Sequence, residues 1–163
     1  MSSFVFETVP KILCEQGGIQ RLGEVARNLG ISRVFVVTDP GLIRAKVLDR
    51  ALESLAAWHI DTHVFSDVQA DPPEQSVQAA AQAATAFEAN GVIGIGGGSS
   101  MDTAKLVALL ARTPQKLPEI YGVGLAQGPR LALVQVPTTA GTGSEVTPIS
   151  ILTTPTHEKK GVV

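Results

Sequence analysis

Three features are scarce in this sequence of 163 residues: cysteine, aromatic side chains and excess charge of one sign. The single cysteine, Cys14, cannot form an internal disulfide, so we expect a reducing compartment and a cytoplasmic location. Aromatic residues make up 4% of the chain, and 13 Lys and Arg nearly balance 15 Asp and Glu. Because the chain has no basic block and few rings on which bases could stack, we expect no nucleic-acid partner.

Long apolar runs and clusters of metal ligands are also missing. The longest helical apolar run, residues 106–111, is far too short to cross a bilayer, so we expect no membrane partner. The N-terminus lacks the basic start and apolar stretch of a signal peptide. His59 and His63 straddle a helix end and a strand start, and His157 stands alone in a polar turn. We therefore predict no metal site and no catalytic residue in this chain.

The chain does contain short apolar strands that alternate with amphipathic helices. Apolar periodicity predicts helices over 19–29, from 40 to about 58, over 74–89, and from the serines at 99–100 to about 112. The segments with the composition of buried parallel strands are 33–38, 61–66, 92–95 and 131–136. This alternation predicts right-handed crossovers, and hence a doubly wound α/β fold with a mostly parallel Rossmann-like sheet. Extra edge strands are predicted at 4–6, 147–153 and 159–163.

The segment 92–105 (VIGIGGGSSMDTAK) organises the rest of the chain. It has the pattern of a buried strand, a glycine turn and a helix, with Ser99 or Ser100 predicted as the helix cap. The three glycines at 96–98 allow a sharp turn and leave backbone N–H groups free at the positive end of a helix, where a phosphate binds. A tight turn without a ligand is the alternative, but three consecutive glycines exceed what such a turn needs.

Polar residues follow the predicted parallel strands, at the edge where ligands bind in open α/β sheets. Asp39 ends the first strand and Asp71 lies in the loop after the second. A carboxylate at Asp39 can accept hydrogen bonds from both ribose hydroxyls of an adenosine and would repel a 2′-phosphate, which favours NAD over NADP. Its alternative role is a helix N-cap. Asp102, in the first turn of the helix after the glycines, either complements the helix dipole or faces a ligand's sugar or reacting end.

The loop after the fourth strand carries several hydroxyl groups, which can bind pyrophosphate, ribose or a carboxamide; they are Thr138, Thr139, Thr142 and Ser144. The alternative is a set of turns in which these hydroxyls satisfy their own backbone. Neither glycine segment fits a common phosphate-binding fingerprint. The acid precedes the glycines by two strands, whereas in the usual dinucleotide motif it follows them, and no Gly-Lys-Ser/Thr closes a P-loop.

Two segments, 96–105 (GGGSSMDTAK) and 137–147 (PTTAGTGSEVT), resemble the iron-containing alcohol dehydrogenase family. The resemblance covers essentially the whole chain and includes the Thr-Asp pair at 38–39. The first motif is shared with glycerol dehydrogenases and dehydroquinate synthases, whereas the second is more specific to the alcohol dehydrogenase branch. The resemblance implies a dehydroquinate synthase-like fold, with residues 1–163 as the N-terminal dinucleotide-binding domain of an NAD-dependent oxidoreductase.

The resemblance also implies a set of cofactor-binding residues. In the family the glycine turn holds the pyrophosphate, the positions of Asp39 and Asp71 lie around the adenosine, and the 137–147 loop and Lys160 line the rest. Asp71 departs from the asparagine often found there. The complete predicted set is Asp39, Asp71, Gly97, Gly98, Ser99, Asp102, Thr138, Thr139, Thr142, Thr147 and Lys160.

Family members bind a divalent metal, iron or zinc, through one Asp and three His of a helical C-terminal domain that this chain lacks. That metal acts as a Lewis acid on the oxygen of an alcohol or aldehyde substrate. We therefore expect a homodimeric, metal-dependent alcohol dehydrogenase as the parent protein, and a catalytically inactive isolated chain. The alternatives are a free-standing nucleotide-binding module, an NAD-dependent lyase and a glycerol dehydrogenase relative.

Overall fold

The computed structural model describes residues 8–163, and its centre is a four-stranded parallel sheet with the strand order β2-β1-β3-β4. All four predicted parallel strands are confirmed. Their bounds are Arg33–Val37 (β1), Asp61–Phe65 (β2), Gly91–Gly96 (β3) and Ala132–Pro137 (β4). Every neighbouring pair is parallel, and the register of β3 on β4 brings Gly96 opposite Pro137. The strand predicted at residues 4–6 lies outside the described residues.

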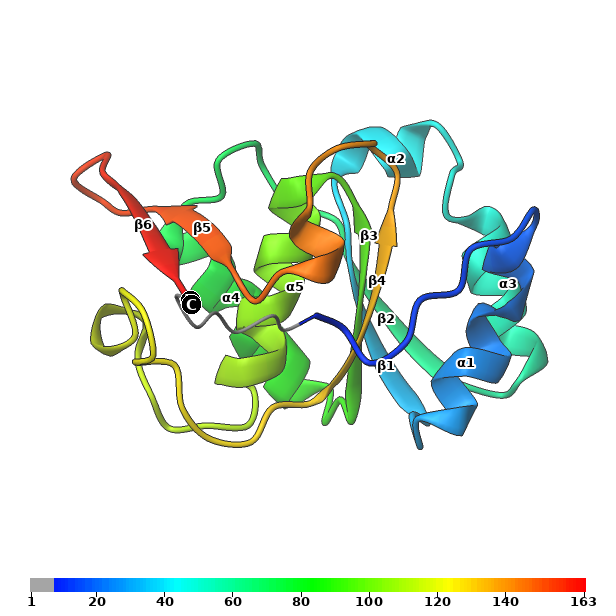
Figure 1. The fold of residues 1–163 in the computed structure, drawn as a ribbon. Helices are drawn as coiled ribbons and strands as arrows, with labels where there is room; N and C mark the ends of the chain where they lie inside the picture. Colours follow the sequence, from blue (N-terminus) through cyan, green and yellow to red (C-terminus); the bar gives the residue numbers. More distant parts are fainter. Residues whose placement is uncertain (1–7) are drawn as a thin grey trace, which may run out of the picture.

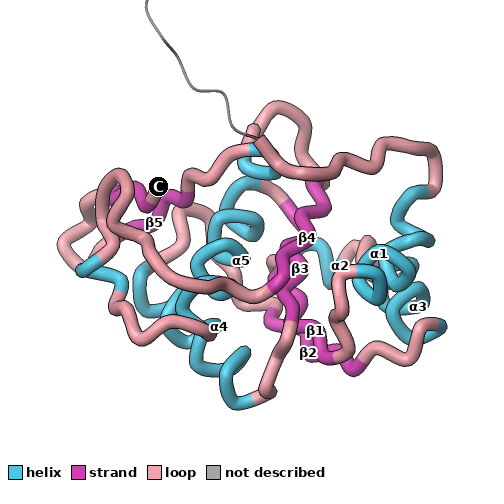
Figure 2. The backbone as a smooth tube through the Cα atoms, turned by 60° about the horizontal axis from the view of Figure 1, so that its bottom comes forward, coloured by secondary structure: helices cyan, strands magenta, loops and turns pink. Residues whose placement is uncertain are grey.

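Helices cover both faces of this sheet, as the doubly wound prediction requires (Figures 1 and 2). On one face lie α1 (Leu22–Asn28) and α3 (Asp49–Ala57), and on the other lie α4 (Glu74–Ala86) and α5 (Gly98–Leu110). Among the described residues, no helix is both long enough and apolar enough to cross a membrane. Single turns of 3-10 helix occur at Gly18–Arg21, Leu117–Glu119 and Ser144–Val146.

The alternating side chains of β1 build the two halves of the core. Val34 and Val36 pack with residues of α1 and α3, whereas Phe35 and Val37 pack with residues of α4 and α5. All four are fully buried, and burial of each such side chain contributes about 1.5–3 kcal/mol. The sheet is thus held from both faces, which leaves the carboxyl ends of its strands as the edge available for a site.

The prediction of one continuous helix from residue 40 to about 58 is wrong. The structure contains two helices here, a short α2 (Pro40–Arg44) and α3. Lys46 between them adopts a left-handed backbone with φ 55°, and the Val47 N–H donates to the carbonyl of Leu42, which terminates α2. The apolar periodicity runs through this break, so it could not reveal the break. The whole of the short α2 therefore lies beside the carboxyl ends of the parallel strands.

The predicted strands at 147–153 and 159–163 exist in shorter form but are not edge strands of the main sheet. They are β5 (Ser150–Thr153) and β6 (Lys159–Val162), and they pair antiparallel with each other as a separate two-stranded sheet. The chain reverses between them because the Thr154 N–H donates to the carbonyl of Glu158. The pair packs through Leu152 and Val162 against Leu117 and Ile120, beside α5 (Figure 1).

Candidate functional site

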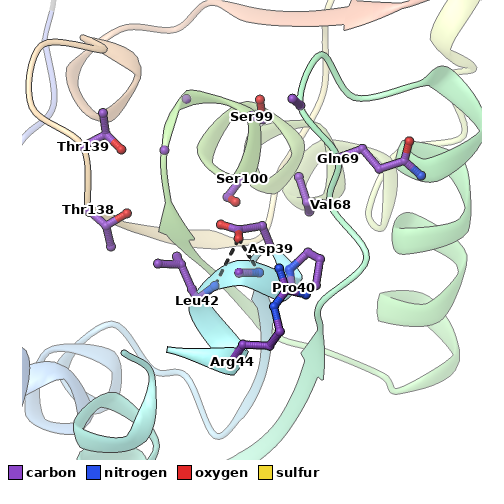
Figure 3. Close-up of a pocket in the computed structure, with 14 residues that line it drawn as sticks. Asp39, Pro40, Leu42, Arg44, Val68, Gln69, Ser99, Ser100, Thr138 and Thr139 are labelled. Carbon is purple, nitrogen blue, oxygen red and sulfur yellow. Dashed lines mark hydrogen bonds between the residues drawn. The ribbon is translucent and has the colours of Figure 1, made fainter. Parts of the chain in front are cut away.

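A pocket of about 620 Å³ opens at the carboxyl ends of β1, β3 and β4 (Figure 3). This is the edge at which open α/β sheets bind ligands. Figure 3 shows Thr138 and Thr139 on one side of it and Gln69 on the opposite side, with Asp39 and Ser99 between them. The predicted cofactor-binding residues that line this pocket are Asp39, Gly97, Gly98, Ser99, Thr138 and Thr139.

Gly96, the first residue of the glycine turn (residues 96–98), is required by the fold. Its φ of 153° is rarely adopted by other residues. A Cβ at this position would lie 2.5 Å from Ser100 Oγ and 2.7 Å from Ser100 Cβ, which real packing does not permit. A glycine here is therefore needed to pass from β3 into α5, with or without a ligand.

Gly97 and Gly98 are not required in this way. Gly97 has φ −81° and ψ −169°, an extended backbone that any residue adopts. A Cβ on Gly97 would meet Thr139 Oγ1 at 3.4 Å, and one on Gly98 would meet Thr142 Cβ at 3.8 Å, both ordinary contact distances. Each Cβ would enter the gap between the glycine turn and the loop after β4. The missing side chains therefore leave room for a ligand that approaches the backbone closely.

The start of α5 supplies the donors for such a ligand. The N-cap is Gly97, and no side chain of the described residues forms a cap hydrogen bond with this helix. The prediction of Ser99 or Ser100 as the cap is therefore wrong: the helix begins at Gly98, so both serines lie inside its first turn. N–H groups in the first turn of a helix have no partner within the helix, and the helix dipole adds positive potential there. A phosphate fits both properties.

Asp39 caps α2 and also faces the pocket. Its Oδ1 accepts hydrogen bonds from the N–H groups of Gly41 (2.8 Å) and Leu42 (3.1 Å), drawn as dashed lines in Figure 3. Both bonds use the same carboxylate oxygen. No described residue donates a hydrogen bond to Oδ2, so this oxygen is available to a ligand's hydroxyl groups and the two predicted roles of Asp39 are compatible.

Arg44 and the segment 68–70 line the pocket as well, and sequence reasoning missed them. Arg44 is the last residue of the short α2, and no feature of the predicted continuous helix singled it out. Val68 is held in place by its N–H, which donates to the carbonyl of Thr38 at 3.3 Å. No local signal marks this contact, since it joins the loops after two adjacent strands.

Three other predicted residues lie outside the pocket lining, near the β5–β6 pair: Asp71, Thr147 and Lys160. The Thr153 N–H donates to the carbonyl of Pro72 at 2.9 Å, which holds β5 against the loop that contains Asp71. The carboxylate of Asp71 accepts from Lys159 Nζ at 2.8 Å, while Lys160 Nζ pairs with Glu158 Oε2 at 2.9 Å. The structure thus pairs Asp71 with Lys159 and does not bring it to Lys160.

Thr142 also lies outside the pocket lining, and its side chain forms hydrogen bonds within its own turn. Its hydroxyl donates to Glu145 Oε2 at 2.8 Å and accepts from the Ser144 N–H at 3.3 Å. The Glu145 carboxyl has a lowered pKa because its own backbone N–H, and then the Thr142 hydroxyl, stabilise the charged form. For this residue the structure shows the alternative role, a hydroxyl that satisfies the local turn.

Asp102 faces the chain beyond β4 and does not line the pocket. Its Oδ1 accepts from the Ser144 hydroxyl and from Lys105 Nζ (3.3 Å), and its Oδ2 accepts from the Ile151 N–H (3.0 Å). Lys105 Nζ also donates to Ser144 Oγ (3.0 Å) and to the carbonyl of Ile149 (2.6 Å). We call this group of side chains and backbone atoms the α5 clasp. Burial lowers the pKa of the Lys105 ammonium, and the carboxylate of Asp102 opposes that shift.

Metal ligands do not gather in the part of the chain that the structure describes. Among residues 8–163, no group of three or more His, Cys, Asp or Glu lies close enough together to hold a metal ion. What these residues can do chemically is bind a ligand, with backbone N–H donors, one carboxylate, one guanidinium and two threonine hydroxyls.

An open parallel sheet with a glycine turn and an uncapped helix at its carboxyl edge defines a class of α/β domains that bind phosphate-bearing ligands. Residues 10–163 match the family described as iron-containing alcohol dehydrogenase, and the chain belongs to this family.

Known proteins of this kind are similar over nearly the whole chain. A sulfoacetaldehyde reductase of Bilophila wadsworthia is 39% identical over 162 residues, which are 99% of this chain and 42% of the relative. A 1,3-propanediol oxidoreductase structure superposes with a TM-score of 0.95 at 28% identity, over 99% of this chain and 43% of that one. The structure of a sulfoacetaldehyde reductase from Bifidobacterium kashiwanohense in complex with NAD+ has a TM-score of 0.83 at 28% identity, over 91% and 40%. The chain thus spans less than half the length of these relatives.

Proposed function

We propose that residues 1–163 are the dinucleotide-binding domain of an NAD-dependent, metal-dependent alcohol dehydrogenase. The observation that carries the proposal is the pair Gly97 and Gly98, which the fold does not need but which opens space beside the uncapped start of α5. A similar chain has been crystallised with NAD+, and its match covers 91% of the present one. A ligand with two linked phosphates would explain why the free space and the N–H donors coincide.

Each part of the pocket would have one task in holding the dinucleotide. The backbone N–H groups at Gly98 and Ser99 would donate to the pyrophosphate. The free Oδ2 of Asp39 would accept from the ribose hydroxyls of the adenosine, and its charge would favour NAD over NADP. Thr138 and Thr139 would donate from the opposite wall. Asp71, Thr147 and Lys160 do not line the pocket, so their contacts with the dinucleotide stay a prediction from the family resemblance.

The chemistry would be a hydride transfer from the carbon of an alcohol to the nicotinamide, with loss of the hydroxyl proton, which leaves the corresponding aldehyde. The nicotinamide supplies the hydride acceptor when bound, and the family's divalent metal, iron or zinc, polarises the substrate oxygen. In the parent protein the metal ligands and most of the substrate pocket would come from chain outside residues 1–163. We therefore expect this chain alone to bind dinucleotide without oxidising alcohols.

A titration of NADH with the chain tests the proposal. Binding is expected to raise and blue-shift nicotinamide fluorescence, and Gly98→Ala should move this change to about hundredfold higher NADH concentrations. Gly161→Ala serves as a control, because its backbone is not left-handed, no described atom lies within 4 Å of a Cβ there, and the residue does not line the pocket. Absence of any NADH signal in the wild-type chain would refute the proposal, as would alcohol-dependent NADH production by the isolated chain.

Two further expectations concern the parent protein, a homodimeric assembly and a cytoplasmic location. The single thiol of Cys14, which is exposed, is consistent with the second. Analytical ultracentrifugation of the parent and cell fractionation would test them separately.

A further inference from the structure

The two walls of the pocket come from distant parts of the chain, and only one of them is well anchored by its own packing. The glycine turn continues a fully buried strand into a helix of 13 residues. The facing wall belongs to residues 138–143, which we call the hydroxyl loop. Of these, residues 138–142 are exposed, and nothing lies within 4 Å of a Cβ placed on Gly141 or Gly143. The loop therefore needs anchors at its ends.

The first anchor is an extension of the sheet. The Thr138 N–H donates to the carbonyl of Gly96 at 2.9 Å, so the start of the loop is held to the glycine turn itself. At its other end the loop enters the short 3-10 turn at Ser144–Val146, which is too short to anchor itself. There Ser144, which is 6% exposed, lies against α5.

The α5 clasp is the anchor at this second end. Asp102 and Lys105 both bond to the Ser144 side chain, and each also bonds to one backbone group, at Ile151 and Ile149 respectively. The side chains of Asp102 and Lys105 are 14% and 13% exposed, so water competes little with these bonds. Five hydrogen bonds thus meet at two residues that are only one helical turn apart.

We call the backbone N–H groups at Gly98 and Ser99, the proposed phosphate donors, the phosphate cradle. The α5 clasp and the phosphate cradle lie on the same helix, α5. Gly98 begins α5, and Asp102 and Lys105 follow about 6 Å and 10 Å further along the helix axis. The distance between the two pocket walls is therefore set through α5. We infer that Asp102 and Lys105 are positioning residues: they hold Ser144, and thereby the hydroxyl loop, at the right separation from the glycine turn to close on a dinucleotide. This inference rests on the proposed function.

A double variant distinguishes a positioning role of Asp102 and Lys105 from a role in folding alone. Removing one partner of a buried charge pair leaves the other charge unpaired and destabilises the protein, whereas replacing both with apolar residues is often neutral for stability. Asp102→Leu with Lys105→Met removes the clasp in this way. The pair Arg21 and Glu24 offers a matched control with the same i,i+3 spacing, at an exposed place remote from the pocket. Arg21→Met with Glu24→Leu is expected to behave like the wild type.

Two measurements on the chain of 163 residues test the inference. The first is hydrogen exchange of peptides covering residues 138–147, with peptides from β3 as the internal reference. The second is the dissociation constant of NADH compared with that of AMP, which in the proposed binding mode would contact the Asp39 end of the pocket but not the hydroxyl loop. A loss of packing alone would weaken both ligands together, so their ratio reports the position of the loop.

The clasp variant is expected to speed hydrogen exchange in residues 138–147 at least about tenfold. Its affinity for NADH should fall about tenfold, and its affinity for AMP should change less than about twofold. Lys105→Arg, which keeps the charge and the donors, should recover most of the NADH affinity. Unchanged exchange in 138–147 would overturn the inference, and so would equal losses of NADH and AMP. If the wild type binds no NADH, the proposed function falls together with the positioning role, while the exchange data still decide whether the clasp holds the loop.

Discussion

The glycine turn at 96–98 and the hydroxyl loop at 138–143 line the same pocket but are held by different forces. The glycine turn is specified by backbone conformation, because Gly96 at φ 153° joins a buried strand to a helix. The hydroxyl loop is exposed, and side chains of α5 that lie more than 30 residues earlier in the chain hold its far end. One wall is thus a product of local sequence and the other a product of tertiary contacts. Substitutions in the two walls should therefore have different effects on stability and on ligand binding.

The largest effect is expected from Gly96→Ala. The new Cβ would overlap Ser100 and force a disfavoured backbone, so the variant should lose about 3 kcal/mol of unfolding free energy. Urea denaturation followed by circular dichroism measures this loss. The neighbouring Gly97→Ala is the control, and it should unfold within about 0.5 kcal/mol of the wild type. Equal destabilisation of the two variants would contradict the distinction between them.

Gly98→Ala should show the opposite behaviour. The fold has room for this Cβ, and alanine is favoured over glycine in a helix, so stability should be unchanged or slightly raised. Because the methyl group would occupy the space in which we propose that a phosphate binds, we expect the dissociation constant of NADH to rise about a hundredfold. Isothermal titration calorimetry gives this constant, and unaltered affinity would count against the phosphate cradle.

Asp39→Gly should change cofactor preference more than stability. Glycine is a tolerated N-cap, so the loss of the two bonds to Gly41 and Leu42 should cost only a few tenths of a kcal/mol. Without the carboxylate, NAD should bind about tenfold more weakly and NADP should become a ligand. Parallel titrations with both dinucleotides measure the ratio of their affinities. If that ratio stays the same, Asp39 does not contact the ribose.

The smallest effect concerns the pH dependence of stability from the 3-10 turn at Ser144–Val146, which follows the hydroxyl loop. The pKa of the Glu145 carboxyl is lowered in the folded chain, chiefly by its own backbone N–H and then by the Thr142 hydroxyl. Glu145 therefore contributes stability at pH values above its unfolded pKa of about 4.5, and this contribution is lost as the pH falls through the folded pKa. Unfolding of the wild type and of Glu145→Gln between pH 7 and pH 3 should show a difference that shrinks on acidification. A difference that is constant with pH would exclude this role.

Much of the fold was predictable because its signals are local. The four parallel strands were found from their apolar composition, and their alternation with helices indicated the doubly wound sheet. Six predicted site residues line one pocket because the carboxyl ends of parallel strands share an edge. The helix break at Lys46 was missed, since a non-glycine residue in a left-handed conformation leaves no mark in a hydrophobic pattern. The predicted serine caps were wrong because the observed N-cap, Gly97, lies two residues before Ser99, the first residue with a good capping side chain.

The sequence by itself determined where the strands run, where the chain turns on glycine and at which edge a ligand would bind, because each of these follows from the preferences of a few adjacent residues. Only the tertiary structure decided what Asp102, Lys105 and Asp71 contact, since, apart from the Asp102–Lys105 pair itself, the partners named above lie 39 to 88 residues further along the chain. The sequence pattern around a charged side chain does not indicate which residue it will pair with. Its partner is chosen by which elements pack together and by how much water that packing excludes.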